Sequence, residues 1–187
     1  MTATEISVLA IDPGGTSGWY WISIPRDCIF GYEDSRVVEF DYGEFTGDLA
    51  YQAEEIATLA RELQGLEYKV GPAIICEAWD IDPAFKVTDL ETLSPVELGA
   101  MLKLLRRQKK LADCSLHFQQ RGQAFSCMTD ERLRKRGLWI EGSDHIRAAC
   151  RHAYTALRRA NENLAFAKEL WPYDGLWTVQ PEAMRRR

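Results

Sequence analysis

The distribution of apolar residues predicts three strands in the first 45 residues of the chain. Residues Ile6–Asp12 are apolar and β-branched and end at a Pro-Gly-Gly turn, which is typical of a buried strand entering a tight turn. A second run, apolar and aromatic, covers Gly18–Ile24, and a third covers Arg36–Phe45. Because only a short Gly-rich segment separates the first two runs, they predict a hairpin, and all three fit an antiparallel meander.

Helical and strand patterns then alternate. Apolar residues recur at helical spacing in Asp48–Leu63, with Asp48 as N-cap and Gly65 as the stop. Pro72–Cys76, followed by Glu77, is a further buried strand. The remaining predicted elements are a helix from Ser94 to about Leu111, opened by the capping box S-P-V-E, a short strand Ser115–Gln119, a loop Gln119–Thr129, a basic helix Thr129–Arg136, a long helix Ser143–Leu164 capped by Ser143 or Asp144, and a loosely ordered segment from Trp171.

This order of elements predicts one α/β domain with a five-stranded sheet flanked by helices. A chain of 187 residues buries about 70% of its unfolded surface and needs no disulfides. The five cysteines are odd in number and form no C-x-x-C pair, which predicts reduced thiols and a cytoplasmic location. No apolar run approaches the roughly 20 residues of a membrane span, and Met1–Glu5 does not resemble a signal peptide.

The net charge of −5 argues at first against a DNA-binding protein, but the charge is unevenly distributed. Residues 1–95 carry 5 basic and 18 acidic side chains, whereas residues 96–187 carry 18 basic and 10 acidic ones. An acidic half joined to a basic half indicates nucleic-acid interaction.

Two acidic residues stand at the ends of predicted strands. Asp12 closes the first strand, and Glu77 closes the fourth in the same way. Each acid alone is more often a cap or an ion-pair partner than a ligand. If the two strands are neighbours, however, the carboxylates converge, and hard oxygen ligands of this kind select Mg²⁺ or Mn²⁺. The start of the long helix, Asp144-His145, is a third source of ligands.

Three blocks carry a resemblance to a known family. They are LAIDPGGTSGW around Asp12, AIICEAW around Glu77 and SDHIRAACRHAYTAL from Ser143. In this order they resemble the RuvC-like Holliday junction resolvases of the RNase H-like superfamily, and phage-encoded members in particular. The resemblance covers about residues 5–160.

The resemblance implies an RNase H-like mixed sheet in a nuclease domain of residues 1–170, followed by a basic tail of residues 171–187. It further implies a homodimer that cleaves four-way DNA junctions with two Mg²⁺ or Mn²⁺ ions. By the same resemblance Asp12 bridges both metals, Glu77 binds one and helps to place the attacking water, and Asp144 and His145 supply the remaining ligands.

One position departs from the phage pattern, in which an Asp commonly follows the histidine by three residues. Here that position is Ala148, and alanine cannot ligate a metal. Three explanations stay open. Asp144 takes over the role; a deliberate Asp→Ala change disables cleavage; or the protein binds junctions without cutting them. For Asp144 the plainer alternative is an N-cap only, and for His145 an exposed polar residue.

Basic residues of the second half supply the candidate DNA contacts, although a basic run is most often a solvated face. Three such runs around one acidic cluster are better explained by phosphate backbones. The predicted DNA-binding residues are Arg106, Lys109, Lys110, Arg121, Arg132, Arg134, Lys135, Arg147 and Arg151. Arg106, Lys109 and Lys110 are expected to share one helix face. Phe125 either stacks on an unpaired base or belongs to the core.

A different class of enzyme also begins with a strand, an Asp and a Gly/Thr turn. Actin-like and sugar-kinase-like ATPases have this opening, but they need a second phosphate-binding lobe, for which 187 residues leave no room.

Overall fold

The computed structural model describes residues 5–25, 39–65, 71–78, 93–111, 113–173 and 176. Its strands are β1 (Glu5–Asp12), β2 (Ser17–Pro25), β3 (Glu39–Phe45), β4 (Ala73–Ala78) and β5 (Leu116–Gln120). They form one sheet in the order β3-β2-β1-β4-β5. β1–β2 and β2–β3 pair antiparallel, whereas β1–β4 and β4–β5 pair parallel. The predicted meander and the mixed five-stranded sheet are therefore confirmed; residues 36–38 of the predicted third strand lie outside the described residues.

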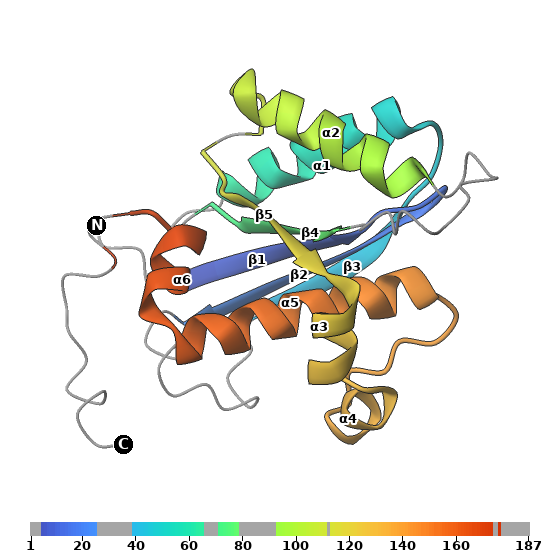
Figure 1. Cartoon of the computed structure of the whole chain (residues 1–187), viewed down its shortest axis with the longest axis vertical. Coiled ribbons are helices and arrows are strands. Elements are labelled where there is room, and N and C mark those ends of the chain that lie inside the picture. The colour runs from blue at the N-terminus through green and yellow to red at the C-terminus, as the bar shows by residue number, and fades with distance from the viewer. Residues whose placement is uncertain are drawn as a thin grey trace, which may run out of the picture.

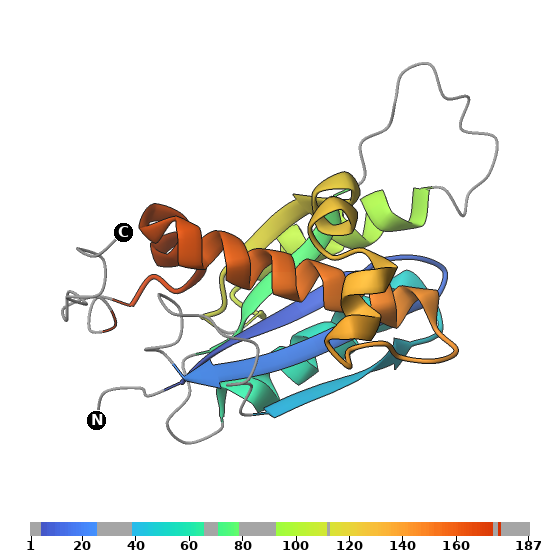
Figure 2. The same cartoon turned by 90° about the horizontal axis from the view of Figure 1, so that it is seen from below.

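Helices cover both faces of this sheet. α1 (Leu49–Gln64) and α2 (Ser94–Arg107) lie on one face, and α5 (Asp144–Glu162) lies on the other (Figures 1 and 2). Alternate residues of β1 divide between the two cores: Leu9 and Ile11 pack with α1 and α2, whereas Val8 and Ala10 pack with α5. Burial on both faces explains why β1 is a continuous apolar run rather than an alternating one.

Three shorter helices complete the fold: α3 (Arg121–Cys127), α4 (Asp130–Lys135) and α6 (Leu164–Leu170). The predicted loop Gln119–Thr129 is wrong, because α3 starts directly after β5. The predicted long helix to Leu164 ends at Glu162, since Asn163 has an extended backbone and caps α6 by accepting from two of its amide groups. None of the described helices is long and apolar enough to cross a membrane.

The segment from Trp171 begins inside the core rather than as a loose tail. The Trp171 side chain is fully buried, and its Nε1 donates to the backbone oxygen of Ser7 at 3.0 Å. Leu176 is also buried. The prediction of a loosely ordered segment from Trp171 is therefore wrong for these two residues, because a large apolar ring adds more by burial than its chain loses in entropy. Residues 177–187 lie outside the described residues.

At the helix ends, two predicted caps are confirmed and two other predictions are wrong. Asp48 caps α1 by accepting from the Tyr51 amide, and Gly65 follows its last turn. The capping box at Ser94 is absent, because Ser94 is already helical and buried. α2 ends at Arg107, and Lys109 has a positive φ of 57°. This left-handed residue takes Lys109 and Lys110 off the helix, so the shared face predicted for them with Arg106 does not form.

Candidate active site

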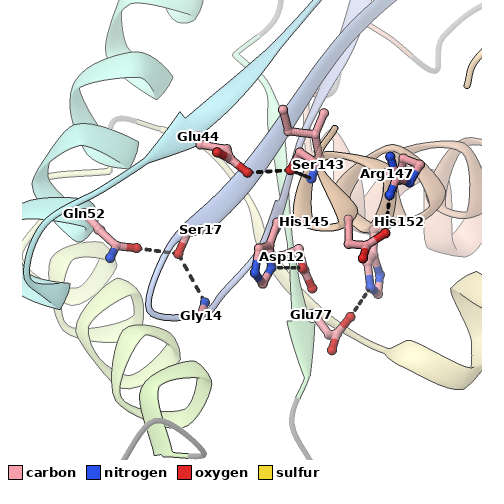
Figure 3. Close-up of polar contacts among 12 residues, drawn as sticks. Asp12, Gly14, Ser17, Glu44, Gln52, Glu77, Ser143, His145, Arg147 and His152 are labelled. Carbon is pink, nitrogen blue, oxygen red and sulfur yellow. Dashed lines mark hydrogen bonds and ion pairs between the residues drawn. The ribbon is translucent and has the colours of Figure 1, made fainter. Parts of the chain in front are cut away.

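Two buried carboxyl groups meet at one edge of the sheet. In the parallel register of β1 and β4, Ile11 is the partner of Cys76, so the next residues on the two strands are Asp12 and Glu77. β1 ends at Asp12 and β4 one residue after Glu77, and the two side chains lie close together in Figure 3. Asp12 is 7% exposed and Glu77 is 3% exposed. The structure therefore brings together the two acids that the strand ends predicted.

The two carboxyl groups differ in acidity because their partners differ. Burial raises the pKa of Asp12, and the neighbouring charge of Glu77 raises it further, against the hydrogen bond from His145. Burial also acts to raise the pKa of Glu77, but the hydrogen bond and charge of His152 outweigh it, so that pKa lies below its usual value. Paired carboxylates in a buried site repel each other, and a bound cation relieves this repulsion.

His145 contacts Asp12 from the first turn of α5. Its Nδ1 lies 2.7 Å from Asp12 Oδ2, and its side chain is 45% exposed. The hydrogen bond to Asp12 raises the pKa of His145, against the effect of burial, and the charges of Asp12, Glu44 and Asp144 add to the rise. His145 therefore contacts Asp12, the acid with which the sequence predicted it to share a metal, and its ring is half-exposed.

The start of α5 is held against the sheet at two further points. Ser143 is the N-cap: its Oγ accepts from the Ile146 amide and donates to the Glu44 carboxylate on β3. Gly18, the β2 partner of Asp12, lies directly under this turn. A Cβ on Gly18 would lie 2.5 Å from the backbone oxygen of His145. Only glycine permits this approach, which sequence analysis did not identify although Gly18 stands in the DPGGTSG block.

His152 is a site residue that sequence reasoning missed. It is fully buried, and its Nε2 lies 2.9 Å from Glu77 Oε2. Its Nδ1 lies 3.3 Å from Gln119 Oε1, while Gln119 Nε2 is buried without a hydrogen-bond partner among the described residues. The detectable signal was spacing, because His145 and His152 are seven residues apart on one helix face.

Gln52 is a second missed residue, and it braces the turn that follows Asp12. This fully buried side chain accepts from Ser17 Oγ at 2.5 Å and donates to the carbonyl oxygens of Gly15 and Gly47, each at 2.9 Å. Figure 3 shows the Ser17 contact and the hydrogen bond from the Gly14 amide to Ser17. The turn between β1 and β2 is thereby fixed to α1.

Asp144 is placed differently from Asp12 and Glu77. Its side chain is 95% exposed and forms an ion pair with Arg147. The hydrogen bond from Arg147 holds the pKa of Asp144 below its usual value. Asp144 is the first residue of the helix rather than its cap. The structure therefore does not bring it into contact with Asp12.

A pocket of about 280 Å³ lies between these groups. Its lining contains Asp12, Arg121, Phe125, Asp130, Asp144, His145, Arg147, Ala148 and Arg151. Ala148 is 4% exposed and presents only a methyl group. Among the residues that the structure describes, no three His, Cys, Asp or Glu side chains are arranged to hold a metal ion. Asp12 and Glu77 nevertheless fit one hard cation, because Mg²⁺ is commonly held by one or two carboxylates with water and substrate oxygens.

The predicted DNA-binding residues fall into two groups. Those of α3, α4 and α5 lie on the α5 side of the sheet, beside the pocket, whereas Arg106, Lys109 and Lys110 belong to or follow α2 on the opposite face (Figure 1). Arg106 donates to the backbone oxygen of Leu116.

Several arginines beside the pocket are engaged within the protein. Arg151 is 4% exposed, donates to the Met128 carbonyl at 3.0 Å and pairs with Asp130. The guanidinium groups of Arg121 and Arg151 lie 4.9 and 4.4 Å from the ring centre of Phe125. Phe125 is therefore part of a cation–π stack in the pocket wall.

A second stack includes Arg147, which also lines this pocket. Arg134 and Arg147 lie 3.6 and 4.6 Å from the ring centre of Trp139. Arg132 donates to the carbonyl of Cys127 at the end of α3. These contacts fix the orientation of the basic side chains beside the pocket.

The comparisons with known proteins agree with this architecture. The structure of T. thermophilus RuvC in complex with a Holliday junction substrate matches with a TM-score of 0.54 at 12% identity, covering 84% of this chain and 96% of that chain. The Thermus thermophilus RuvC structure matches over the same shares at 0.53 and 13%. The yeast mitochondrial Holliday junction resolvase Ydc2 matches at 0.51 and 16%, covering 92% of this chain and 83% of that one. No family model and no curated protein matches the sequence. The likeness confirms the predicted RNase H-like fold.

Proposed function

We propose that this protein is a metal-dependent, structure-selective endonuclease that cuts branched DNA such as Holliday junctions. The observation that carries the proposal is the buried pair of Asp12 and Glu77 at the ends of parallel strands, with His145 in contact with Asp12 (Figure 3). Two features support it: the fold shared with RuvC, one of whose structures holds a Holliday junction substrate, and the sequence blocks that resemble phage-encoded resolvases.

Asp12 and Glu77 are the residues that would hold a divalent cation, and His145 is a half-exposed nitrogen donor in contact with Asp12. When bound there, the cation supplies Lewis-acid activation of water and neutralises charge on the phosphodiester. Asp144 remains a weaker candidate ligand, because it has to leave Arg147 first.

The residues around the carboxylates keep them in place. His152 holds one oxygen of Glu77, and Gln52 fixes the turn after Asp12. Gly18 and Ser143 hold the first turn of α5, which carries His145. This arrangement preorganises the site before substrate binds, as electrostatic catalysis requires.

The surroundings of the site fit a DNA backbone. The exposed arginines of the two stacks, Arg121 and Arg134, and the basic α4 lie beside the pocket that contains Asp12. Such side chains position phosphates without reading bases. A four-way junction has two equivalent strands to cut, so we infer a homodimer that presents one site to each. The described cysteines are free thiols, which supports a cytoplasmic location, in the host cell if the gene belongs to a phage.

A junction-binding protein without catalysis is less well supported. Buried carboxyl groups cost free energy unless they are compensated. A protein that only bound DNA would gain no binding free energy from two buried carboxyl groups beside its basic side chains.

Nicking of a synthetic four-way junction tests the proposed function. The wild-type chain should introduce paired nicks with Mg²⁺ or Mn²⁺, whereas Asp12→Asn and Glu77→Gln should abolish nicking and still bind the junction in a gel-shift assay. Wild-type protein that binds but leaves junctions and flaps uncut with both metals contradicts the proposal.

A further inference from the structure

We propose that the Asp12–Glu77 site holds a single divalent cation rather than a pair. The inference rests on the proposed function and concerns only the number of ions. Two cations in one nuclease site stand about 3.5–4 Å apart and bring four positive charges together. Within the described residues, Asp12 and Glu77 are the carboxyls that converge, and two negative charges match one divalent ion.

The second oxygen of Glu77 is already engaged. His152 Nε2 lies 2.9 Å from Oε2, and both side chains are buried. A hydrogen bond to a charged group in such surroundings is strong and is not readily exchanged for a metal. Glu77 therefore offers Oε1 to a ligand, while Oε2 keeps the carboxylate oriented.

The two other positions near the pocket do not supply a second set of ligands. Asp144 is 95% exposed and paired with Arg147. Ala148 follows His145 by three residues, so it lies on the same face of α5 and lines the pocket with Asp12. Its methyl group stands where a longer acidic side chain could reach the pocket.

The charges that line this pocket also oppose a second cation. Three arginines, Arg121, Arg147 and Arg151, line it. Arg147 and Arg151 are paired with Asp144 and Asp130, so each of those acids would have to leave its arginine before it could hold a metal. The charge of Arg121 acts on Glu77 and lowers its pKa, so positive charge is present near this carboxylate without a second ion.

Manganese binding to the full chain tests this count directly. Titration calorimetry should give one Mn²⁺ per chain, and electron paramagnetic resonance should show an isolated ion without coupling to a neighbour. Ala148→Asp places a third carboxylate in the pocket and should raise the stoichiometry to two, with the spectrum of a coupled pair. Ala148→Asn, which has the same shape without the charge, should stay at one ion, and Asp12→Asn should bind none.

The outcomes separate the inference from the proposed function. Two coupled ions in the wild-type chain overturn the single-cation inference and leave the nuclease proposal standing. No Mn²⁺ bound at millimolar concentration overturns the proposed metal dependence itself. An Ala148→Asp chain that is folded but still binds one ion overturns the role assigned to Ala148. The wild-type measurement decides the count even if that variant does not fold.

Discussion

His152 on α5 holds Glu77 on β4 across the interface between helix and sheet, with Nε2 and Oε2 2.9 Å apart and both side chains buried. The contact joins residues 75 positions apart in the chain. It fixes a carboxylate of the proposed metal site without approaching the pocket that contains Asp12, so its loss has consequences for both stability and activity.

His152→Ala should lower the free energy of unfolding by about 3 kcal/mol, because it leaves a buried carboxylate without its partner. His152→Gln retains a donor and should recover part of this loss, together with part of the nicking activity. Urea unfolding measures the first effect and a junction-nicking assay the second. His117→Ala, a half-buried histidine on β5 away from the site, is the matched control and should keep full nicking. Equal nicking by His152→Ala and wild type would contradict the positioning role.

Gly18→Ala should displace the first turn of α5 and move His145 from Asp12. The added Cβ meets backbone atoms of His145 and Ile146, which cannot shift as a side-chain end can. We expect a loss of about 3 kcal/mol in stability, at the upper end of overpacking effects, with strongly reduced nicking. Gly15→Ala in the same turn has nothing within 4 Å of its Cβ and should behave as wild type. A thermal melt that does not distinguish the two variants counts against the close approach.

The His145 ring should titrate above its ordinary pKa of 6.5, because the hydrogen bond to Asp12 favours the charged imidazole. Asp12→Asn should bring the pKa down. A raised folded-state pKa means that the contact stabilises the protein fully below pH 6.5, and that this contribution is lost as pH rises through the folded value. NMR titration of the metal-free protein, assigned with His145→Gln, measures the shift. An unchanged His145 titration midpoint in Asp12→Asn would contradict this contact.

Cysteine labelling should separate Cys127 from three other thiols. Burial raises the pKa of Cys114 and of Cys150 to about 12 each and raises that of Cys76 further. The thiolate is the reactive form, so iodoacetamide at pH 8 should label Cys127, which is partly exposed, well before these three in a Cys28→Ser background. Denaturation should make all four react. Mass spectrometry of the labelled peptides reports the order of labelling. Early labelling of Cys150 would contradict its burial in the structure.

Local sequence patterns predict the sheet and the two acids at its edge. Continuous apolar runs predict strands buried on both faces. An acid that follows such a run is expected at the edge of the sheet, because a carboxylate is unfavourable in the apolar core. The positions of Asp12 and Glu77 follow from these local patterns once β1 and β4 are neighbours. The caps at Asp48 and Gly65 were equally local, since both depend on backbone groups within one turn of the helix.

Which polar side chains support those acids, and which face away from them, depends on how the helices pack on the sheet. His152, Gln119 and Gln52 find partners that are 33 to 75 residues distant, and no pattern of hydrophobic spacing encodes such pairs. The hydrogen bond from Trp171 to the backbone of Ser7, 164 residues away, depends on packing in the same way. So does the position of Asp144, which the sequence predicted as a ligand beside His145 but which pairs with Arg147 in the structure. Local periodicity specifies the faces of helices and strands; which side chains meet depends on how those faces pack, and packing is a property of the folded chain.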